Sequence, residues 1–208
     1  RLETQNILSW IPSGSSVCDV GCGEGEGTLE YSKIANVVGV DSSPVRLEFA
    51  RKRCPDVAFK RCSVFDLEGS FDVVISQRLL VNLSCWEEQQ RALIVLGKAS
   101  KLVIISEGSI QGMENLNAFR LCMGLKPIPV PEHNVFIDES FLLNFTRSLG
   151  WKLKGCKTLG SYYLLTRGVQ PALTDNLTWD SDFNLRSSKV DLPCSDRFSR
   201  VKQWAFIT

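Results

Sequence analysis

Short apolar segments alternate with segments of helical spacing through the first half of the chain, and this alternation constrains the fold more than any other feature. The apolar segments lie at residues 17–20, 36–40, 56–61, 71–76 and 101–106. Strands that are apolar throughout are typical of parallel sheets with helices on both faces. The sequence therefore predicts an α/β fold with a mostly parallel sheet covered on both faces.

Cap residues mark where two of the helices begin. Ser43 stands before a proline, a pair that suits the N-cap and the first position of a helix, and Val45 and Phe49 would then form the inward face of that helix. Ser84 and Glu87 have the spacing of a capping box before the next long helical segment. We expect both helices to pack on the sheet.

The pattern changes after residue 107. A helix is predicted around residues 113–124, and the proline-rich segment 125–138 follows it. Long irregular segments in a compact domain are commonly functional. We therefore expect residues 107–138 to form a lid over a substrate.

Strands are expected again near the end of the chain. Asp138 can cap a helix that ends at Gly150, and residues 151–159 and 161–167 have the pattern of a hairpin. Residues 201–207 also have the composition of a strand, within an otherwise turn-rich C-terminal segment.

Charge, hydropathy and cysteine content exclude several classes of protein. Lysine plus arginine (24) nearly balances aspartate plus glutamate (23), which argues against a nucleic-acid partner. No apolar run approaches the roughly 20 residues of a membrane span. The eight cysteines lack the paired spacing of a zinc site, so we expect no metal, reduced thiols and a cytoplasmic protein. The start at Arg1 indicates a further segment upstream.

The segment VCDVGCGEGEG (residues 17–27) carries the strongest chemical signal. Gly21, Gly23 and Gly25 lie between a predicted strand and helix, where glycine lets the backbone turn tightly around a ligand. Asp41 ends the next strand, 22 residues after Asp19, where a carboxylate can take both hydroxyls of a ribose. The acidic residues in the loop would repel a pyrophosphate. The pattern favours a nucleoside ligand with a cationic end and no phosphate.

Together with VVGVDSSP and FDVVIS, this segment resembles the class I S-adenosylmethionine-dependent methyltransferases over residues 15–167. The resemblance implies a Rossmann-like three-layer sandwich, in which a mostly parallel seven-stranded sheet has an antiparallel closing strand. It also implies a methyltransferase domain at residues 1–167, with residues 168–208 as an extension packed on the same domain. The cofactor would be S-adenosylmethionine.

The resemblance also assigns roles to residues. The cofactor would be bound by Asp19, Gly21, Gly23, Gly25, Asp41, Ser42, Ser63, Val64 and Gln77. Members of the family often have an acidic residue for the adenine amino group, where this chain has Ser63 beside Val64. Either Ser63 or a backbone amide reads the adenine edge, or the nearby Asp66 does.

The acceptor should lie where the fourth and fifth strands end. His133, the only histidine, suits a general base, or it anchors its own turn. Glu107 is a second candidate base, or it caps the loop. Arg78 and Arg120 could clamp an acidic acceptor, or they are surface arginines, and Asn82 lies in the same region.

A narrower resemblance concerns RLLVNLSCWEEQQRAL, ENLNAFRLCMGLKPIPVPEHNVFIDE and FSRVKQWAF. These segments are similar to bacterial methyltransferases associated with glycan biosynthesis, which implies methyl transfer to a sugar or glycan hydroxyl. Two alternatives stay open: a small-molecule or natural-product O- or N-methyltransferase, and a cofactor-binding regulatory domain without activity. A DNA amino-methyltransferase is disfavoured because SQRL (residues 76–79) stands where its Asn/Asp-Pro-Pro-aromatic motif belongs. The sequence carries no signal for an oligomeric state.

Overall fold

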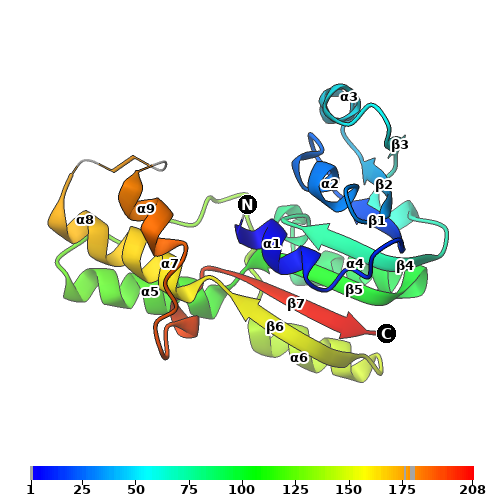
Figure 1. Cartoon of the computed structure of the whole chain (residues 1–208). Helices are drawn as coiled ribbons and strands as arrows, with labels where there is room; N and C mark the ends of the chain where they lie inside the picture. Colours follow the sequence, from blue (N-terminus) through cyan, green and yellow to red (C-terminus); the bar gives the residue numbers. More distant parts are fainter. Residues whose placement is uncertain (1, 176, 179–180) are drawn as a thin grey trace.

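A seven-stranded sheet in the order β3-β2-β1-β4-β5-β7-β6 forms the middle layer of the fold (Figure 1). The structure, a computed structural model, describes residues 2–175, 177–178 and 181–208. The strands are β1 Ser16–Val20, β2 Asn36–Asp41, β3 Ala58–Arg61, β4 Phe71–Gln77, β5 Ser100–Gly108, β6 Lys152–Thr158 and β7 Val201–Ile207. Neighbouring strands pair in parallel except at β7, which is antiparallel to β5 and β6. The predicted Rossmann-like fold with an antiparallel closing strand is confirmed.

Helices cover both faces of this sheet. The α-helices are α1 Leu2–Leu8, α2 Glu26–Tyr31, α3 Pro44–Arg53, α4 Trp86–Ala99, α5 Ile110–Cys122, α6 Glu139–Ser148, α7 Gly160–Tyr163, α8 Gln170–Leu173 and α9 Asp182–Ser187. Short turns form η1 Val64–Asp66, η2 Leu80–Asn82 and η4 Asp196–Phe198, and η3 Leu164–Val169 is a π-helix. Ile7 and Tyr31 pack on one face, and Leu93 and Leu142 pack on the other. The fold therefore has three layers.

Two predicted caps are confirmed. The Ser43 side chain accepts a hydrogen bond from the amide of Arg46 at 3.3 Å and caps α3. Asp138 accepts from the amide of Ser140 at 2.8 Å and caps α6, and Gly150 follows that helix with φ +84°. Local sequence therefore fixes where these helices begin and end.

The inward face predicted for α3 is wrong. Val45 and Phe49 are exposed, whereas Leu47 and Ala50 are buried in a cluster beside the glycine loop. A four-residue spacing places two side chains on one face of a helix, and it does not indicate which face meets the core.

The predicted capping box before α4 is also shifted. The carboxylate of Glu88, not Glu87, accepts hydrogen bonds from the amide and the hydroxyl of Ser84 at 3.0 and 2.9 Å. The N-cap of α4 is Cys85, one residue later than the box predicts.

The strand predicted at residues 161–167 is helical instead. Tyr163, Thr166 and Gln170 are buried at spacings of three and four residues, and Gly168 lies against Phe119 of α5. A short apolar run is compatible with either structure, and packing against α5 selects the helix. The partner of β6 is β7, so the final strand of the sheet comes from the segment predicted as an extension. Residues 176, 179 and 180 of that segment lie outside the described residues.

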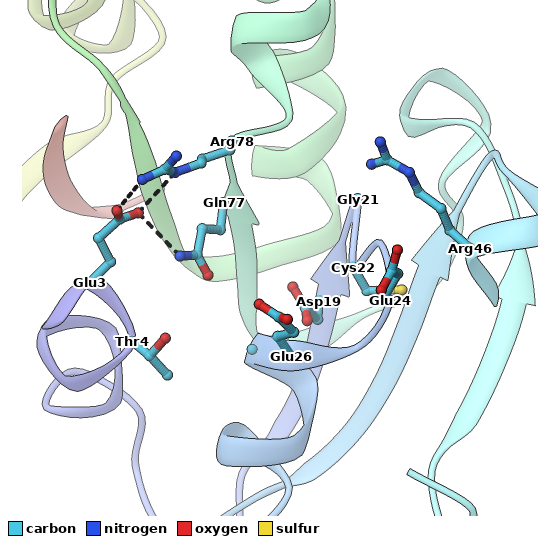
Figure 2. A pocket seen from close by; sticks show the side chains of 11 residues that line it. Glu3, Thr4, Asp19, Gly21, Cys22, Glu24, Glu26, Arg46, Gln77 and Arg78 are labelled. Atoms are coloured by element: carbon cyan, nitrogen blue, oxygen red, sulfur yellow. Dashed lines mark hydrogen bonds and ion pairs between the residues drawn. The ribbon is translucent and has the colours of Figure 1, made fainter. Parts of the chain in front are cut away.

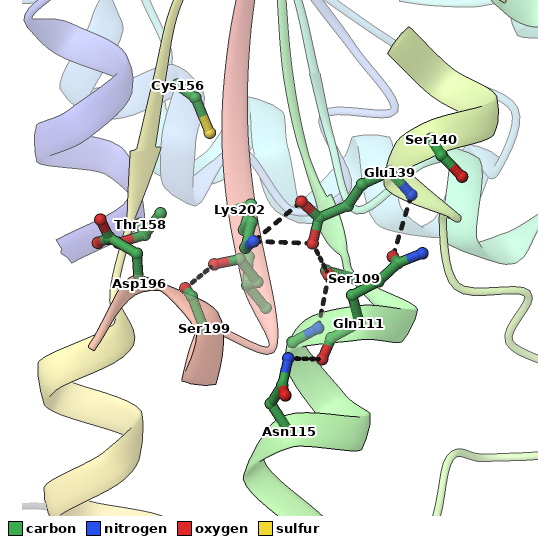
Figure 3. Close-up of polar contacts among 12 residues, drawn as sticks. Ser109, Gln111, Asn115, Glu139, Ser140, Cys156, Thr158, Asp196, Ser199 and Lys202 are labelled. Atoms are coloured by element: carbon green, nitrogen blue, oxygen red, sulfur yellow. Dashed lines mark hydrogen bonds and ion pairs between the residues drawn. The ribbon is translucent and has the colours of Figure 1, made fainter. Parts of the chain in front are cut away.

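A polar network anchors both ends of the segment 107–138 (Figure 3). Lys202 of β7 donates to both carboxylate oxygens of Glu139, at 2.8 and 2.9 Å. Ser109 donates to the same carboxylate, and the amide of Glu139 donates to the Gln111 side chain at 3.1 Å. The starts of α5 and α6 are therefore fixed to the sheet, and a lid movement would be restricted to the residues between them.

α5 projects beyond the sheet, contacts η3 and η4, and forms with α7, α8 and α9 a helical lobe at one end of the molecule (Figure 1). Within the described ranges, no helix has the length and the apolar character needed to cross a membrane.

Candidate functional site

Two cavities lie where β1, β2 and β4 end, and they meet at Gly21. The larger, of about 530 Å³, is drawn in Figure 2 and is lined by Glu3, Thr4, Asp19, Gly21, Cys22, Glu24, Glu26, Gly27, Arg46, Gln77 and Arg78. The smaller, of about 110 Å³, is lined by Gly21, Asp41, Ser42, Cys62, Ser63, Val64, Phe65, Leu79 and Leu83. All of the predicted cofactor residues except Gly23 and Gly25 therefore line one of these cavities.

The glycine loop needs glycine for both conformation and space. Gly21, Gly23 and Gly25 have φ values of +72°, +55° and +78°, in the left-handed region that other residues rarely adopt. A Cβ on Gly21 would lie 2.8 Å from the Leu79 side chain, and a Cβ on Gly25 would lie 3.3 Å from Ala50. Gly23 and Gly25 thus shape the loop without lining the cavities.

Three backbone amides at the start of this loop are bonded inside the protein. The amides of Gly21 and Cys22 donate to the carbonyl of Val40 at 2.8 and 3.0 Å, and the amide of Gly23 donates to the Asp41 carboxylate at 2.9 Å. A loop that holds a phosphate turns such amides toward the ligand. The geometry therefore favours a ligand without phosphate, as the sequence predicts from charge alone.

Asp41 is 8% exposed and lines the smaller cavity. One carboxylate oxygen accepts from the amide of Gly23, and the other accepts from the amide of Ser43 at 2.8 Å. Each oxygen keeps a lone pair for a further donor. Asp41 can therefore receive two hydroxyls while the loop holds it in place.

Asp19 lies deeper, at the end of β1. It is 4% exposed, and the hydroxyl of Thr28 donates to its carboxylate at 2.5 Å. Burial raises the pKa of Asp19 to about 6, the bond from Thr28 opposes this shift, and the charge of Asp41 adds to it. A cationic ligand group beside Asp19 would restore the charged carboxylate.

The other two acids of the loop also line the larger cavity but are far more exposed. The side chains of Glu24 and Glu26 are 52% and 83% exposed, and Arg53 of α3 lies 4.0 and 3.6 Å from their carboxylates. The sequence-based interpretation gave all three acids equal weight. The structure buries only Asp19 among them.

The smaller cavity contains the residues expected at the adenine. Ser63 caps η1 by accepting from the amide of Phe65 at 3.3 Å, and Val64 is buried beside it. Asp66 is exposed and is not among the lining residues. The arrangement favours Ser63 and Val64 over Asp66.

Gln77 and Arg78 end β4 on the wall of the larger cavity. Gln77 accepts from the hydroxyl of Tyr31 at 2.9 Å and donates to Glu3 of α1 at 3.2 Å. Arg78 forms an ion pair with Glu3 and has a φ of +54°, a strained value for a residue with a side chain. Strain of this kind is common at ligand sites.

Glu107 is fully buried beneath η2, and neither cavity has it in its lining. Its two oxygens accept from the amides of Leu80 at 2.7 Å and Val81 at 3.2 Å. Burial raises the pKa of Glu107 to about 8, although these amides and the Arg78 charge oppose the shift. Glu107 therefore organises the turn after β4, and its predicted role as a base has no contact with the cavities.

Asn82 and His133 lie near one another outside the lining residues. Asn82 donates to the carbonyl of Arg78 at 2.6 Å and accepts from Asn134 at 3.3 Å. His133 is exposed in the turn that precedes Asn134. The segment predicted as a lid thus contacts the turn after β4.

Arg120 belongs to the helical lobe. It donates to the carbonyl of Lys126 at 2.9 Å and to the carbonyl of Arg167. Burial and the neighbouring Arg167 lower its pKa. These contacts join α5 to the loop after it and to η3, and Arg120 does not line either cavity.

Sequence reasoning missed several lining residues outside the glycine loop, namely Glu3, Thr4, Arg46, Cys62, Phe65, Leu79 and Leu83. Glu3 and Thr4 come from α1, which no motif connects with the glycine loop. Cys62 directly precedes Ser63, so the register of the adenine segment could have indicated it.

Comparisons with known proteins agree with this geometry. Residues 17–98 match the family described as a methyltransferase domain. "Putative methyltransferase 235L" of Invertebrate iridescent virus 6 is 29% identical over 82 residues, which cover 36% of this chain and 31% of that protein. The chain thus matches about a third of the length of this curated relative.

Solved structures share the fold over nearly the whole chain. Magnesium protoporphyrin IX methyltransferase from Synechocystis PCC 6803 with bound S-adenosylmethionine has a TM-score of 0.63 at 15% identity, covering 98% of this chain and 77% of that one. The TehB-like methyltransferase of Corynebacterium glutamicum has a TM-score of 0.61 at 16% identity, covering 100% and 87%. The [4+2]-cyclase SpnF has a TM-score of 0.66 at 15% identity, covering 99% and 80%. At such identities the similarity shows the fold.

The residues at the two cavities fit the groups of S-adenosylmethionine. Asp19 offers a buried carboxylate to an ammonium, Asp41 offers two acceptors to a ribose, and the smaller cavity has an apolar wall at Val64 for a base. The match of residues 17–98 to a methyltransferase domain and the fold shared with the solved methyltransferases agree with this fit.

Proposed function

We propose that the protein transfers the methyl group of S-adenosylmethionine to a hydroxyl of a sugar or a glycan precursor. The observation that carries the proposal is the pair of cavities that meet at Gly21, one with Asp19 and the other with Asp41. A nucleoside with an amino-acid end has two parts of this kind. The occupied backbone amides of the loop support a ligand without phosphate.

The cofactor supplies an activated methyl group and its own leaving group, so the protein has to align the acceptor and exclude water. Asp19 would hold the ammonium and Asp41 the ribose hydroxyls, while Ser63 and Val64 would lie against the adenine. Gly21 joins the two cavities, which would leave the reactive centre facing the wall formed by Gln77 and Arg78.

The polar lining of the larger cavity supports a polyhydroxylated acceptor. Glu3, Thr4, Gln77 and Arg78 offer donors and acceptors there, and no aromatic side chain is among its described lining residues. A cavity for a flat aromatic acceptor would be lined mainly by apolar and aromatic groups. The resemblance to glycan-associated methyltransferases points in the same direction.

His133 is our proposed general base for the acceptor hydroxyl. The turn that carries it contacts η2 through Asn134 and Asn82, and Asn82 in turn donates to the carbonyl of Arg78, a residue of the larger cavity. Glu107 would act as a positioning residue because the amides of Leu80 and Val81 occupy its oxygens. We also propose a cytoplasmic location, since all eight cysteines are free thiols.

Transfer of a labelled methyl group tests the proposal. The protein would be incubated with methyl-labelled S-adenosylmethionine and a panel of sugars, lipid-linked oligosaccharides, phenols and amines. We expect label in the sugar or oligosaccharide fractions and a strongly reduced transfer rate in His133→Ala. Label found only in phenols or amines would replace the glycan acceptor with a small-molecule one, and an unchanged transfer rate in His133→Ala would reject the base.

A further inference from the structure

Four hydrogen-bond donors converge on the carboxylate of Glu3, and Figure 2 shows the bonds from Gln77 and Arg78. Gln77 donates to it at 3.2 Å, Arg78 donates through Nε at 3.2 Å and through Nη2, and Ser106 donates at 3.4 Å. A guanidinium that donates through two nitrogens, with two neutral donors beside it, is suited to bind a planar carboxylate, and we call this group of donors the receptor. The ends of β4 and β5 therefore form a carboxylate site, and a side chain of α1 is its present occupant.

This receptor faces the cavity that would hold the acceptor. Glu3, Gln77 and Arg78 line the larger cavity together with Asp19 and Gly21. The side chain of Arg78 is 55% exposed, whereas that of Glu3 is 12% exposed. Arg78 can thus be reached by a ligand from solvent, although Glu3 covers part of its donor edge.

Arg200 adds a second positive charge beside the receptor. Its guanidinium lies 6.0 Å from the ring of Tyr163, and both groups are within electrostatic range of Glu3 and Arg78. Among the described residues, the buried Nε of Arg200 has no hydrogen-bond partner. Arg78 and Arg200 would therefore favour an anion at the receptor itself, whereas Asp19, Glu24 and Glu26 line other parts of the larger cavity.

We propose that Gln77, Arg78 and Ser106 form a subsite for the carboxylate of an acidic acceptor, and that Glu3 occupies it until the acceptor displaces it. The inference rests on the proposed function, whose acceptor it narrows to a hydroxy acid such as a uronic acid. The ligand carboxylate would take over the fork of Arg78, and its hydroxyl would remain in the cavity beside Asp19 and Gly21.

If the ion pair between Glu3 and Arg78 only fastens α1 to the sheet, a different result is expected. Loss of the Glu3 charge would then weaken the packing of α1 and leave no carboxylate affinity behind. In a displaceable arrangement the same loss removes an internal competitor, so that an added carboxylate binds more tightly.

Calorimetric titration of the protein with sodium glucuronate distinguishes the displaceable arrangement from the permanent ion pair. The proteins are the wild type, Glu3→Gln, Glu3→Gln with Arg78→Gln, and Glu3→Gln with Arg147→Gln, in which an exposed arginine of α6 serves as the control. We expect Glu3→Gln to bind glucuronate about tenfold more tightly than the wild type, because charged hydrogen bonds to the internal competitor are lost. Glucose, which lacks the carboxylate, should not gain affinity.

Each outcome decides the matter. Tighter binding that disappears with Arg78→Gln and persists with Arg147→Gln supports the subsite. An unchanged affinity in Glu3→Gln, or a gain that survives Arg78→Gln, overturns it. S-adenosylhomocysteine is titrated into the same samples, so a failure of the cofactor site is seen separately from a failure of the carboxylate subsite.

Discussion

The carboxylate of Asp41 accepts a hydrogen bond from the amide of Gly23 at 2.9 Å, and this contact joins the end of β2 to the glycine loop. The same carboxylate lines the smaller cavity. A residue expected to bind a ribose is thus also the residue that holds the loop in its conformation. Binding of the nucleoside and order in the loop should therefore depend on one another.

Replacement of Asp41 tests this dependence. Asp41→Ala removes two acceptors for ribose hydroxyls and releases the amide of Gly23. We expect the affinity for S-adenosylhomocysteine, measured by calorimetry, to fall at least about tenfold, which corresponds to about 1.4 kcal/mol. Asp56→Ala, at an exposed position after α3, should bind as the wild type does. Equal affinities in the two variants would reject the role of Asp41.

Gly21→Ala and Gly14→Ala form a matched pair of loop variants. Both glycines have a positive φ, +72° and +76°, but only at Gly21 would a Cβ meet a neighbour, 2.8 Å from Leu79. We expect Gly14→Ala to lower the unfolding free energy by about 1 kcal/mol through strain alone. Gly21→Ala should cost more, on the order of 2–4 kcal/mol, and also weaken cofactor binding. Urea unfolding measures both, and equal losses would mean that Leu79 gives way at no cost.

Thr28→Val tests the electrostatics of Asp19. The hydroxyl of Thr28 opposes the burial that raises the pKa of Asp19 to about 6. Cofactor affinity in the wild type should fall as the pH drops through about 6, because a protonated Asp19 no longer attracts an ammonium. Thr28→Val should move this midpoint upward.

Thr146→Val, a buried threonine of α6 that bonds to a backbone carbonyl, is the control for loss of a hydroxyl. Its midpoint should stay at the wild-type value. A pH-independent affinity in the wild type would contradict the assignment of Asp19 to the ammonium.

Glu107 should make the protein less stable as the pH rises. Burial raises its pKa from 4.5 to about 8, so the folded state retains a proton that the unfolded state has lost between these values. The associated stability is present below pH 4.5 and is lost as the pH rises through about 8, with a total on the order of a few kcal/mol. Asp19 contributes with the same sign between 3.8 and about 6.

Urea unfolding between pH 5 and 8 checks this with Glu107→Gln. The slope of unfolding free energy against pH should be smaller in Glu107→Gln than in the wild type, and unchanged in the exposed control Glu114→Gln. Parallel profiles in all three proteins would mean that the amides of Leu80 and Val81 keep Glu107 charged throughout.

Local chemistry made part of the fold predictable. The side chains of Ser43 and Asp138 accept hydrogen bonds from amides no more than three residues away, so the sequence alone indicates these two caps. The continuous apolar strands similarly follow from burial of both sheet faces. The helix at residues 160–163 was missed because its contacts with η4 and α9 come from residues far away in the sequence.

The candidate site was likewise predictable only in part. Asp19, Gly21, Asp41 and Ser63 lie at or just after strand ends that a β-α-β pattern brings together, and their convergence was predictable. Glu3 reaches the site only because α1 packs beside the end of β4, and no motif marks it. Glu107 also lies near a strand end, but its side chain lies under η2 and accepts hydrogen bonds from backbone amides there, which its position in the sequence does not indicate.

Titration of S-adenosylhomocysteine and NAD into the same protein tests the central claim most directly. The amides of Gly21, Cys22 and Gly23 are bonded within the protein, and Asp19, Glu24 and Glu26 place acidic side chains in the larger cavity, so the loop is unfavourable for a pyrophosphate. We expect S-adenosylhomocysteine to bind with one molecule per chain and NAD not to bind. Binding of NAD without binding of S-adenosylhomocysteine would contradict the assignment of the two cavities to a phosphate-free nucleoside.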